Sequence, residues 1–395
     1  MSLGLKLISR FVKPFRDRIK GYVDAKAIIE SIGTFDNLQF DQTLIYCPAR
    51  YAARLSQAFT ATDSVEVEVE EIFQNEDIHT MDRKYQFTDG VGTLSKDLAR
   101  EIWAQLKATK RQGRASKGSP SAYQIRFMGS KGMLSVDHKL RGNAICLRPS
   151  MIKFEAPQTT NIEIARAFDR PGLYYLNRPL IMLLEGLGIP FDVFKGYQDM
   201  AVHETRTAAH SLSRAAALFE GHGLGTSYRL PSVMRSLERL SNESLTGNQF
   251  YEKMLEYAIN HILRLLKHYA RIPVPGAWTL VGVADVHQHL KPGEIFACIK
   301  PVNGRTRYLE GRVLISRSPT IHPGDVMIVN AIGRPRPGSC FDIEPLPNTV
   351  VFSVLGESLY YFFMFIVDQS TNLVQVTVPY LLALEEGTWM VMFII

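Results

Sequence analysis

The feature that most constrains the fold is a long helical stretch that separates two clusters of short, apolar β-type runs. The first cluster, residues 123–149, contains the runs YQIRFMG, GMLSVD and AICLRP, with glycines between them. The second cluster, residues 278–352, contains WTLVGVAD, EIFACIK, GRVLISR, DVMIVNA and TVVFSV. Such runs with frequent turn residues are typical of compact β units. The sequence therefore predicts two similar β units around a mainly helical spacer over residues 160–270, although it contains no short tandem repeat.

Individual elements are predicted from caps and from the spacing of apolar residues. Leu94 to Leu106 is expected to be a helix with Ser95 as its N-cap, because its leucines and isoleucine recur every four residues. Asn177, followed by Arg178 and Pro179, is expected to open another helix. Further expected elements are a half-buried strand over Val65–Glu71, a helix capped by Asp192, a helix over Thr205–Glu220 that ends at Gly221, and a helix over Phe250–Tyr269.

The positive charge of the chain is concentrated in one segment. The 395 residues carry a net charge of +6, yet residues 98–153 contain twelve Lys or Arg against Glu101 and Asp137, a net charge of +10. A basic segment in a mildly acidic background is typical of a surface that binds a polyanion. A solvated loop beside a charged helix face gives the same pattern, and from charge alone it is the simpler explanation.

Composition excludes several classes of protein. With 46% hydrophobic and 21% charged residues, a chain of 395 residues is expected to be globular, with two or three domains. The longest apolar run, Leu359 to Val367, is nine residues, too short to cross a membrane. The four cysteines form no Cys-x-x-Cys pair, which argues against a zinc ribbon and favours a reduced, intracellular setting, nuclear or cytoplasmic. The basic residues 1–16 are expected to form a surface helix rather than a secretory signal.

Two lysines have the surroundings of a phosphate-binding group. Lys131 stands between Gly129 and Gly132, so both backbone and ammonium can approach a phosphate closely. Lys153 follows 22 residues later, which leaves room for one strand, a turn and a returning strand. Two lysines side by side in a small β unit would suit a triphosphate or the backbone of a growing strand. From spacing alone, two independent turn lysines remain the simpler explanation.

Two other stretches are expected to lie outside the functional site. His287 and His289 flank Gln288 on a predicted turn, and a metal site is not expected there because no further ligand stands near them in the sequence. The last residues, 358–395, hold the dense apolar runs LYYFFMFIV and WMVMFII. These runs are interpreted as a tail that is foreign to the fold, although a buried strand pair is the alternative.

Five motifs stand in order along the chain. They are FTDGVG at Phe87–Gly92, QIRFMGSKG at Gln124–Gly132, LRPSMIKF at Leu147–Phe154, YLNRPLIMLLEGLGIPFDVF at Tyr175–Phe194 and ISRSPTIHPGD at Ile315–Asp325. Together they closely resemble the signatures of the eukaryotic RNA-directed RNA polymerase family of the RNA-silencing pathway. YAARLSQAFTATD, at Tyr51–Asp63, is similar to the lead-in of its fungal members. The resemblance covers roughly residues 44–356.

The resemblance implies an α+β fold of two double-psi β-barrels joined by a mainly helical connector. The implied domains are an N-terminal lead-in (1–84), the first barrel (85–157), the connector (158–274), an incomplete second barrel (275–357) and the divergent tail (358–395). The family's two catalytic lysines fall on Lys131 and Lys153. The same motifs carry Arg126, Arg148, Arg317 and His322, which are expected to contact RNA or nucleotide. The implied partners are a single-stranded RNA template and nucleoside triphosphates, with no membrane; the oligomeric state is left open.

The sequence departs from the family pattern at the metal site. In the family, the second barrel supplies an Asp-x-Asp-Gly-Asp loop that holds Mg²⁺, whereas no Asp-x-Asp occurs anywhere in this sequence. Asp325 and Asp368 are isolated and cannot replace three carboxylates. No metal ligand is therefore assigned, and the chain is expected to resemble a polymerase interrupted inside its second barrel and to be inactive as written. The alternatives are a non-catalytic RNA-binding fragment, or a coding sequence that in truth continues into the aspartate loop.

Overall fold

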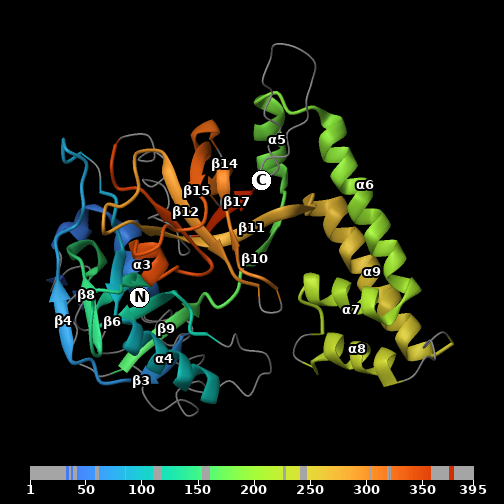
Figure 1. Ribbon diagram of the computed structural model, residues 1–395, viewed down its shortest axis with the longest axis horizontal. Helices are drawn as coiled ribbons and strands as arrows, with labels where there is room; N and C mark the ends of the chain where they lie inside the picture. The colour runs from blue at the N-terminus through green and yellow to red at the C-terminus, as the bar shows by residue number, and fades with distance from the viewer. Residues whose placement is uncertain are drawn as a thin grey trace.

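The computed structural model is a mixed α/β structure with two large β-sheets and a helical arm (Figure 1). In Figure 1 the sheets lie on the left and the arm projects to the right. The structure describes residues 33–34, 37–38, 42–57, 62–84, 86–109, 118–153, 161–225, 228–240, 247–301, 304–317, 320, 322–356 and 373–377. No helix in these ranges is both long enough and apolar enough to span a membrane.

The first sheet has seven strands, and three of the seven come from the first predicted cluster of β runs. Their order across the sheet is β3 (Asp63–Glu66), β9 (Asn161–Ala167), β6 (Ala122–Phe127), β7 (Ser130–Val136), β5 (Val91–Leu94), β8 (Ala144–Leu147) and β4 (Glu71–Gln74). Two pairs are parallel, β5 with β7 and β4 with β8. The single strand predicted over Val65–Glu71 is wrong, because β3 ends at Glu66 and β4 begins at Glu71, with residues 67–70 outside any strand, although Val65 and Val67 are buried as the alternation predicts.

The second sheet has eight strands and also contains two parallel pairs. Its order is β10 (Gly172–Tyr175), β11 (Pro273–Ala284), β16 (Thr349–Phe352), β12 (Glu294–Ile299), β15 (Val326–Ile332), β14 (Glu310–Arg317) and β17 (Leu373–Thr377), and β13 (Arg307–Tyr308) pairs with β12. The parallel pairs are β11 with β16 and β12 with β15. Because β17 pairs with both β14 and β11, the series of pairings that starts at β11 returns to β11.

The two sheets share a hydrophobic core. One cluster of buried side chains joins residues of α4 (Lys96–Thr109) and the first sheet, such as Leu98 and Leu134, to Val283 and Phe296 of the second sheet. A second cluster places Phe87, from the segment before β5, among the side chains of the second sheet. The two β units therefore pack against each other as one body.

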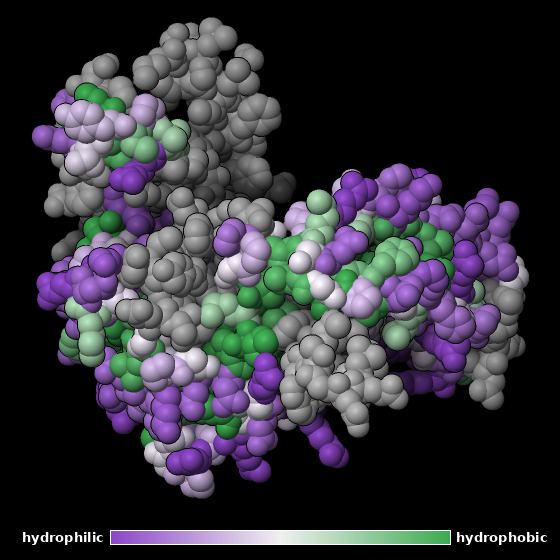
Figure 2. All heavy atoms as spheres, turned by 90° about the horizontal axis from the view of Figure 1, so that it is seen from above, coloured by the Kyte–Doolittle hydropathy of each residue, from purple (hydrophilic) through white to green (hydrophobic). Residues whose placement is uncertain are grey.

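The helical arm contains α5 (Arg178–Gly186), α6 (Phe191–Thr207), α7 (Leu212–Gly221), α8 (Leu230–Leu240) and α9 (Gln249–Tyr269). The long helices α6 and α9 run side by side, with α7 and α8 at their far end (Figure 1). Seen from above, the arm shows hydrophobic side chains among a larger number of hydrophilic ones (Figure 2). Besides α4, the structure describes two helices outside the arm, α3 (Pro48–Gln57) and α10 (Cys340–Ile343).

Several local predictions are confirmed. Ser95 caps α4 by accepting a hydrogen bond from Leu98 N (3.2 Å), and the Asn177 side chain accepts one from Leu180 N (3.0 Å) at the start of α5. The helix predicted over Phe250–Tyr269 is α9.

Two helix predictions differ from the structure. The prediction for Asp192 is wrong, because Pro190 occupies the N-cap of α6 and Asp192 lies in its first turn. The single helix predicted over Thr205–Glu220 is also wrong. Residues 205–207 end α6, a 3₁₀ turn follows over Ala208–His210, and α7 begins after Ser211, whose backbone is extended and whose side chain caps α7.

Part of the predicted tail is a strand. Leu373–Thr377 forms β17, whereas the other residues of 358–395, like residues 1–32, lie outside the described ranges. The sequence LVQVT is rich in β-branched residues, as strands are, and it pairs with both β11 and β14. The structure therefore differs from the interpretation of 358–395 as foreign to the fold at this one segment.

Candidate nucleic-acid and nucleotide site

Three of the sequence motifs meet in the first sheet. FTDGVG leads into β5, QIRFMGSKG forms the β6–β7 hairpin and LRPSMIKF begins at the end of β8, while β5 pairs with both β7 and β8. Glycines allow the close approach: a Cβ at Gly132 would collide with the carbonyl oxygen of Gly90, and one at Gly92 with that of Cys146. Met133 N also donates a hydrogen bond to Gly90 O over 2.8 Å. The glycines of the motifs therefore have a packing role at this junction.

A buried carboxylate, Asp77, joins two of these motifs. Its Oδ1 accepts hydrogen bonds from Thr88 Oγ1 (2.9 Å) and Ser150 Oγ (2.8 Å), and its Oδ2 accepts one from Ser150 N (2.9 Å). Each hydroxyl also accepts a backbone hydrogen bond, Thr88 from Ile78 N (2.8 Å) and Ser150 from Gly90 N (2.9 Å). Sequence reasoning missed Asp77, because it lies outside the motifs and Ser150 is 73 residues away.

The hairpin that carries Lys131 has a tight turn. Met128 and Gly129 are its two turn residues, and both have positive φ angles, 45° and 74°. Two-residue hairpins with such angles are type I′ turns, which match the twist of the flanking strands. Lys131 follows the turn on β7 and is half-buried. The turn fixes the register of the hairpin and therefore the position of Lys131.

Lys153 lies on the backbone segment beside this turn. Its N–H donates to Gly129 O over 3.0 Å, and the preceding residue, Ile152, forms a β-bridge with Ser130. The half-buried Lys153 side chain also donates from Nζ to Ser150 O. The backbones that carry Lys131 and Lys153 are thus adjacent, as the prediction that both lysines serve one site requires.

Arg126 forms a row of charges with its neighbours across the sheet. It pairs with Lys131 of β7 on one side and with Glu163 of β9 on the other, and directly paired residues point to the same face. Burial lowers the pKa of Arg126 to about 10, so the guanidinium stays charged at neutral pH. Its Nη1 donates to Ile125 O over 2.9 Å, while its buried Nε has no hydrogen-bond partner among the described residues. With two cations and one carboxylate, the row keeps a net positive charge and an unused donor, which favours an anion beside Arg126 and Lys131.

Arg148 faces the interior of the first β unit. It is 6% exposed, and its Nη1 donates to the carbonyl oxygen of Glu76, next to Asp77. Its Nε has no partner within the described ranges. In this structure Arg148 supports the segment that carries Asp77, and its contact with RNA stays a prediction.

The two residues expected from the second β unit lie near the end of β14. Arg317 is the last residue of β14 and pairs with Val374 of β17. His322 caps a short 3₁₀ turn: its Nδ1 accepts from Gly324 N (3.0 Å) and its N–H donates to Asp325 Oδ2 (2.8 Å). Asp325 is buried at 2% exposure. The HPGD part of this motif therefore builds a turn, and the RNA-binding role of Arg317 and His322 stays a prediction.

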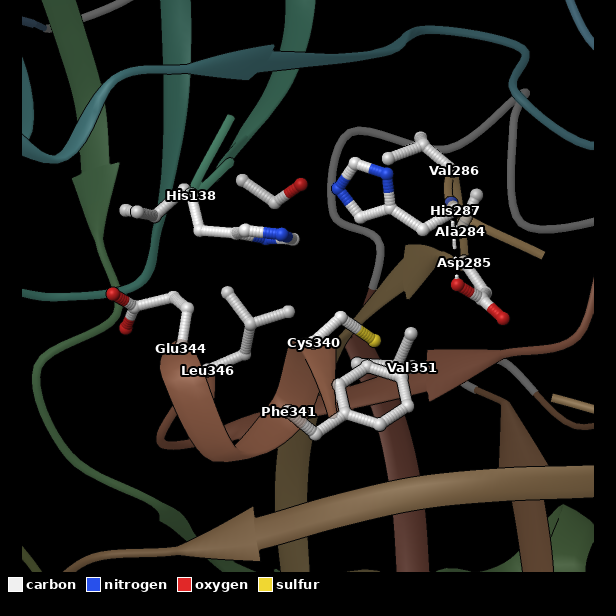
Figure 3. A pocket seen from close by; sticks show the side chains of 12 residues that line it. His138, Ala284, Asp285, Val286, His287, Cys340, Phe341, Glu344, Leu346 and Val351 are labelled. Atoms are coloured by element: carbon white, nitrogen blue, oxygen red, sulfur yellow. Dashed lines mark hydrogen bonds between the residues drawn. The ribbon is translucent and has the colours of Figure 1, made fainter. Parts of the chain in front are cut away.

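The described residues contain one group of three metal-ligating side chains, Asp137, His138 and His287, whose ligand atoms lie within 4.8 Å of one another. His138 and His287 line a pocket between the two β units (Figure 3). Burial opposes the charge on Asp137, but hydrogen bonds from His287 and from Lys139 N hold its pKa below the usual value. Burial, and then the charge of His287, lower the pKa of His138. One carboxylate with two imidazoles does not fit Mg²⁺, which prefers oxygen ligands.

Comparisons with known proteins agree with the motifs. The sequence profile of the RNA dependent RNA polymerase family matches residues 9–359. The chain is 30% identical over 311 residues to "Probable RNA-dependent RNA polymerase 1" of Oryza sativa subsp. japonica, a match that covers 78% of this chain and 39% of that protein. It is 27% identical over 365 residues to "RNA-dependent RNA polymerase 1" of Schizosaccharomyces pombe, covering 85% and 27%.

A solved structure shares the fold. The structure titled "RNA dependent RNA polymerase QDE-1 from Thielavia terrestris" superposes with a TM-score of 0.62 at 18% identity, covering 83% of this chain and 38% of that one. The chain thus spans about a quarter to two fifths of the length of these relatives. Because the family profile matches most of the sequence and the three motifs meet at one junction, the chain belongs to the RNA-dependent RNA polymerase family.

Proposed function

We propose that this chain binds single-stranded RNA and nucleoside triphosphates through its first β unit, as part of RNA-directed RNA synthesis that makes double-stranded RNA for silencing. The observation that carries the proposal is the junction of three motifs, two of them joined by Asp77, in which the backbones that carry Arg126, Lys131 and Lys153 lie at one end of the β6–β7 hairpin. If Lys131 and Lys153 were two independent turn lysines, their backbones would not have to be adjacent. The names of the relatives support the reaction class.

The proposed fold of each β unit is a double-psi barrel. Each sheet contains two parallel pairs among antiparallel ones, and in the second sheet the pairings return to the starting strand. This repeated pattern supports two similar units, at about residues 85–157 and 275–357, joined by the connector over 158–274. Strands β3, β4 and β9 of the first sheet, and β10 and β17 of the second, lie beyond these boundaries. The lead-in over 1–84 and the tail over 358–395 complete the proposed division.

The cations of the first unit would act on phosphate oxygens. Guanidinium and ammonium groups bind phosphate by charge-assisted hydrogen bonds, which are strengthened where water is partly excluded. Arg126 offers a planar donor group from a half-buried position, and the hairpin and the Lys153 segment hold the two lysines close by. In the proposed site these three groups orient the phosphate chain of RNA or of a nucleotide, and they read no base sequence.

Mg²⁺ is the metal that the family's reaction uses, and the described residues do not fit it. Their one group of three potential ligands contains a single carboxylate. The sequence likewise contains no Asp-x-Asp. We therefore assign no step of the reaction to a metal held by this chain.

The absence of Asp-x-Asp favours a second candidate function, an RNA-binding fragment without catalysis of its own. The four cysteines are free thiols, which supports action in a reducing, intracellular compartment for either candidate. The experiment that separates the two uses the purified 395-residue chain, labelled single-stranded RNA, all four nucleoside triphosphates and Mg²⁺. We expect RNA binding without template-dependent nucleotide incorporation. Incorporation would show that this chain is a complete polymerase, and absence of RNA binding would overturn both candidates.

A further inference from the structure

Three potential metal ligands from the two β units converge at their interface. Asp137 and His138 follow β7 of the first sheet, and His287 follows β11 of the second sheet. In Figure 3, His138 and His287 extend toward each other across the pocket, with Cys340 on the wall below them. The pair Asp137 and His287 is 150 residues apart in the sequence. The fold, rather than any local motif, therefore creates the group.

The spacing of the ligand atoms fits a tetrahedral cation. His287 Nε2 lies 3.0 Å from Asp137 Oδ1, and His138 Nδ1 lies 3.9 Å from the same oxygen. Zn²⁺ binds nitrogen and oxygen ligands at about 2.0–2.2 Å, so tetrahedral ligand atoms stand about 3.3 Å apart. The two observed distances lie on either side of this value. Small rotations of the side chains would bring all three atoms to one ion.

The surroundings hold these side chains in place. Asp137 accepts a hydrogen bond from Lys139 N (2.9 Å) and donates its own N–H to Leu94 O (2.9 Å). The His287 loop is fixed by Asp285, which is 2% exposed and accepts from Leu290 N (2.7 Å) and His287 N (3.3 Å). Such support of ligand-bearing loops is a regular feature of metal sites. The site is shielded but reachable, because the three side chains are 11–18% exposed.

His138 is not needed for the hydrogen bond that joins the two β units at this point. The hydrogen bond between Asp137 and His287 by itself links the two β units. His138 adds a second imidazole whose ring centre lies 4.8 Å from that of His287, at an angle of 62°. Two imidazoles and a carboxylate around one point are the ligands that Zn²⁺ prefers, with a fourth position left for water or a further ligand.

We propose that Asp137, His138 and His287 bind one Zn²⁺ ion that joins the two β units. The ion lies at their interface, apart from the cations of the proposed RNA site, and its role is to fix the position of one unit against the other. The proposal does not depend on the proposed function. It predicts that the full chain binds Zn²⁺ in preference to Mg²⁺ and is more stable when Zn²⁺ is bound.

The test uses the full chain after treatment with a chelator. Zn²⁺ binding is measured by calorimetric titration, the ligand geometry by the visible absorption of bound Co²⁺, and stability by thermal unfolding. We expect one equivalent of Zn²⁺, a tetrahedral Co²⁺ spectrum, no binding of Mg²⁺ at this site, and a rise in Tm of a few degrees at saturation. Absence of stoichiometric Zn²⁺ binding would overturn the proposal.

The decisive variant is His138→Gln. It keeps the Asp137–His287 hydrogen bond, so the fold is preserved, yet it removes one of three ligands. We expect Zn²⁺ affinity to fall at least about 100-fold and the Zn²⁺-dependent rise in Tm to disappear. His289→Gln is the matched control, because His289 lies on the same turn as His287, and its ring centre lies 5.4 Å from that of Phe341, but it does not belong to the group. Equal Zn²⁺ affinity in wild type and His138→Gln would contradict the proposal, since the ion would then be bound elsewhere.

Discussion

Replacing Asp77 with asparagine tests the junction that holds the proposed RNA site together. This carboxylate accepts three hydrogen bonds, from Thr88 Oγ1, Ser150 Oγ and Ser150 N. Asp77 is buried, at 8% exposure. Asparagine keeps one acceptor oxygen but puts an NH₂ group where the other oxygen stood. At least one of these donors then faces another donor in a buried position.

The expected cost follows from the number of hydrogen bonds lost. A hydrogen bond to a charged group contributes about 1.5–3 kcal/mol, and a buried donor without a partner costs about 1–3 kcal/mol. Loss of one charged hydrogen bond together with one unsatisfied donor predicts that the free energy of unfolding falls by about 3 kcal/mol for Asp77→Asn. Thr88→Val removes one donor to Asp77 and leaves Ile78 N without its acceptor, so the same reasoning predicts a similar loss, about 3 kcal/mol.

Urea unfolding followed by circular dichroism measures both variants and their combination. Because Asp77 and Thr88 are in direct contact, the double variant should lose less than the sum of the single losses. Asp199→Asn is the matched control, since Asp199 is exposed on α6 and forms a surface ion pair with Lys195, and this variant should have wild-type stability. If the free energy of unfolding of Asp77→Asn lies within about 0.5 kcal/mol of the wild-type value, as is usual for surface substitutions, the reasoning about this junction is wrong.

Two other features give predictions that can be checked in the same unfolding assay. Gly132→Ala should lower the free energy of unfolding by about 3 kcal/mol or more, because the added Cβ collides with the backbone oxygen of Gly90. Wild-type stability of this variant would contradict the close packing of these two segments. Burial, and then the charges of Arg271 and His261, lower the pKa of His222 to about 4. Below about pH 6.5 His222 is therefore protonated in the unfolded chain but stays neutral in the folded chain. Its contribution to the free energy of unfolding is fully present above about pH 6.5 and is lost as the pH falls toward 4. Between pH 7 and pH 5 we expect a loss of about 1 kcal/mol after allowing for partial exposure, and His222→Asn should remove this part of the decline; an unchanged pH dependence would contradict the assignment.

The sequence predicted those features whose cause is local. Ser95 and Asn177 cap helices because a cap needs only a side-chain oxygen three residues before a backbone N–H, and this pattern is visible in the sequence. The two β clusters and the helix over Phe250–Tyr269 likewise follow from composition and spacing. The cap prediction failed at Asp192. This residue is acidic and close to the start of a helix, but the extended backbone that the cap position requires occurs two residues earlier, at Pro190.

The remainder could not be predicted, because it depends on which strands become neighbours. Glu163 of β9 falls in the predicted helical spacer, yet it pairs with Arg126 in the first sheet. His287 has no ligand near it in the sequence, whereas the packing of the two units brings Asp137 to within 3.0 Å. Asp77 connects to Ser150 in the same way. Such contacts follow from sheet order, which periodicity does not encode.

The most direct test of the proposed RNA site is the salt dependence of RNA binding in three chains: wild type, the double variant Lys131→Ala/Lys153→Ala, and the single variant Lys107→Ala. Lys107 is the matched control, because it belongs to the same basic segment but lies exposed on α4, over the ring of Trp103. Fluorescence anisotropy with a labelled single-stranded RNA gives the affinity at a series of salt concentrations. If both lysines contact phosphates, the slope of log affinity against log salt should be smaller by about 1.4 in the double variant, at about 0.7 per phosphate contact, and unchanged in Lys107→Ala. An equal slope in the double variant and the control would contradict the account, because the positive charge of the segment would then act without a site.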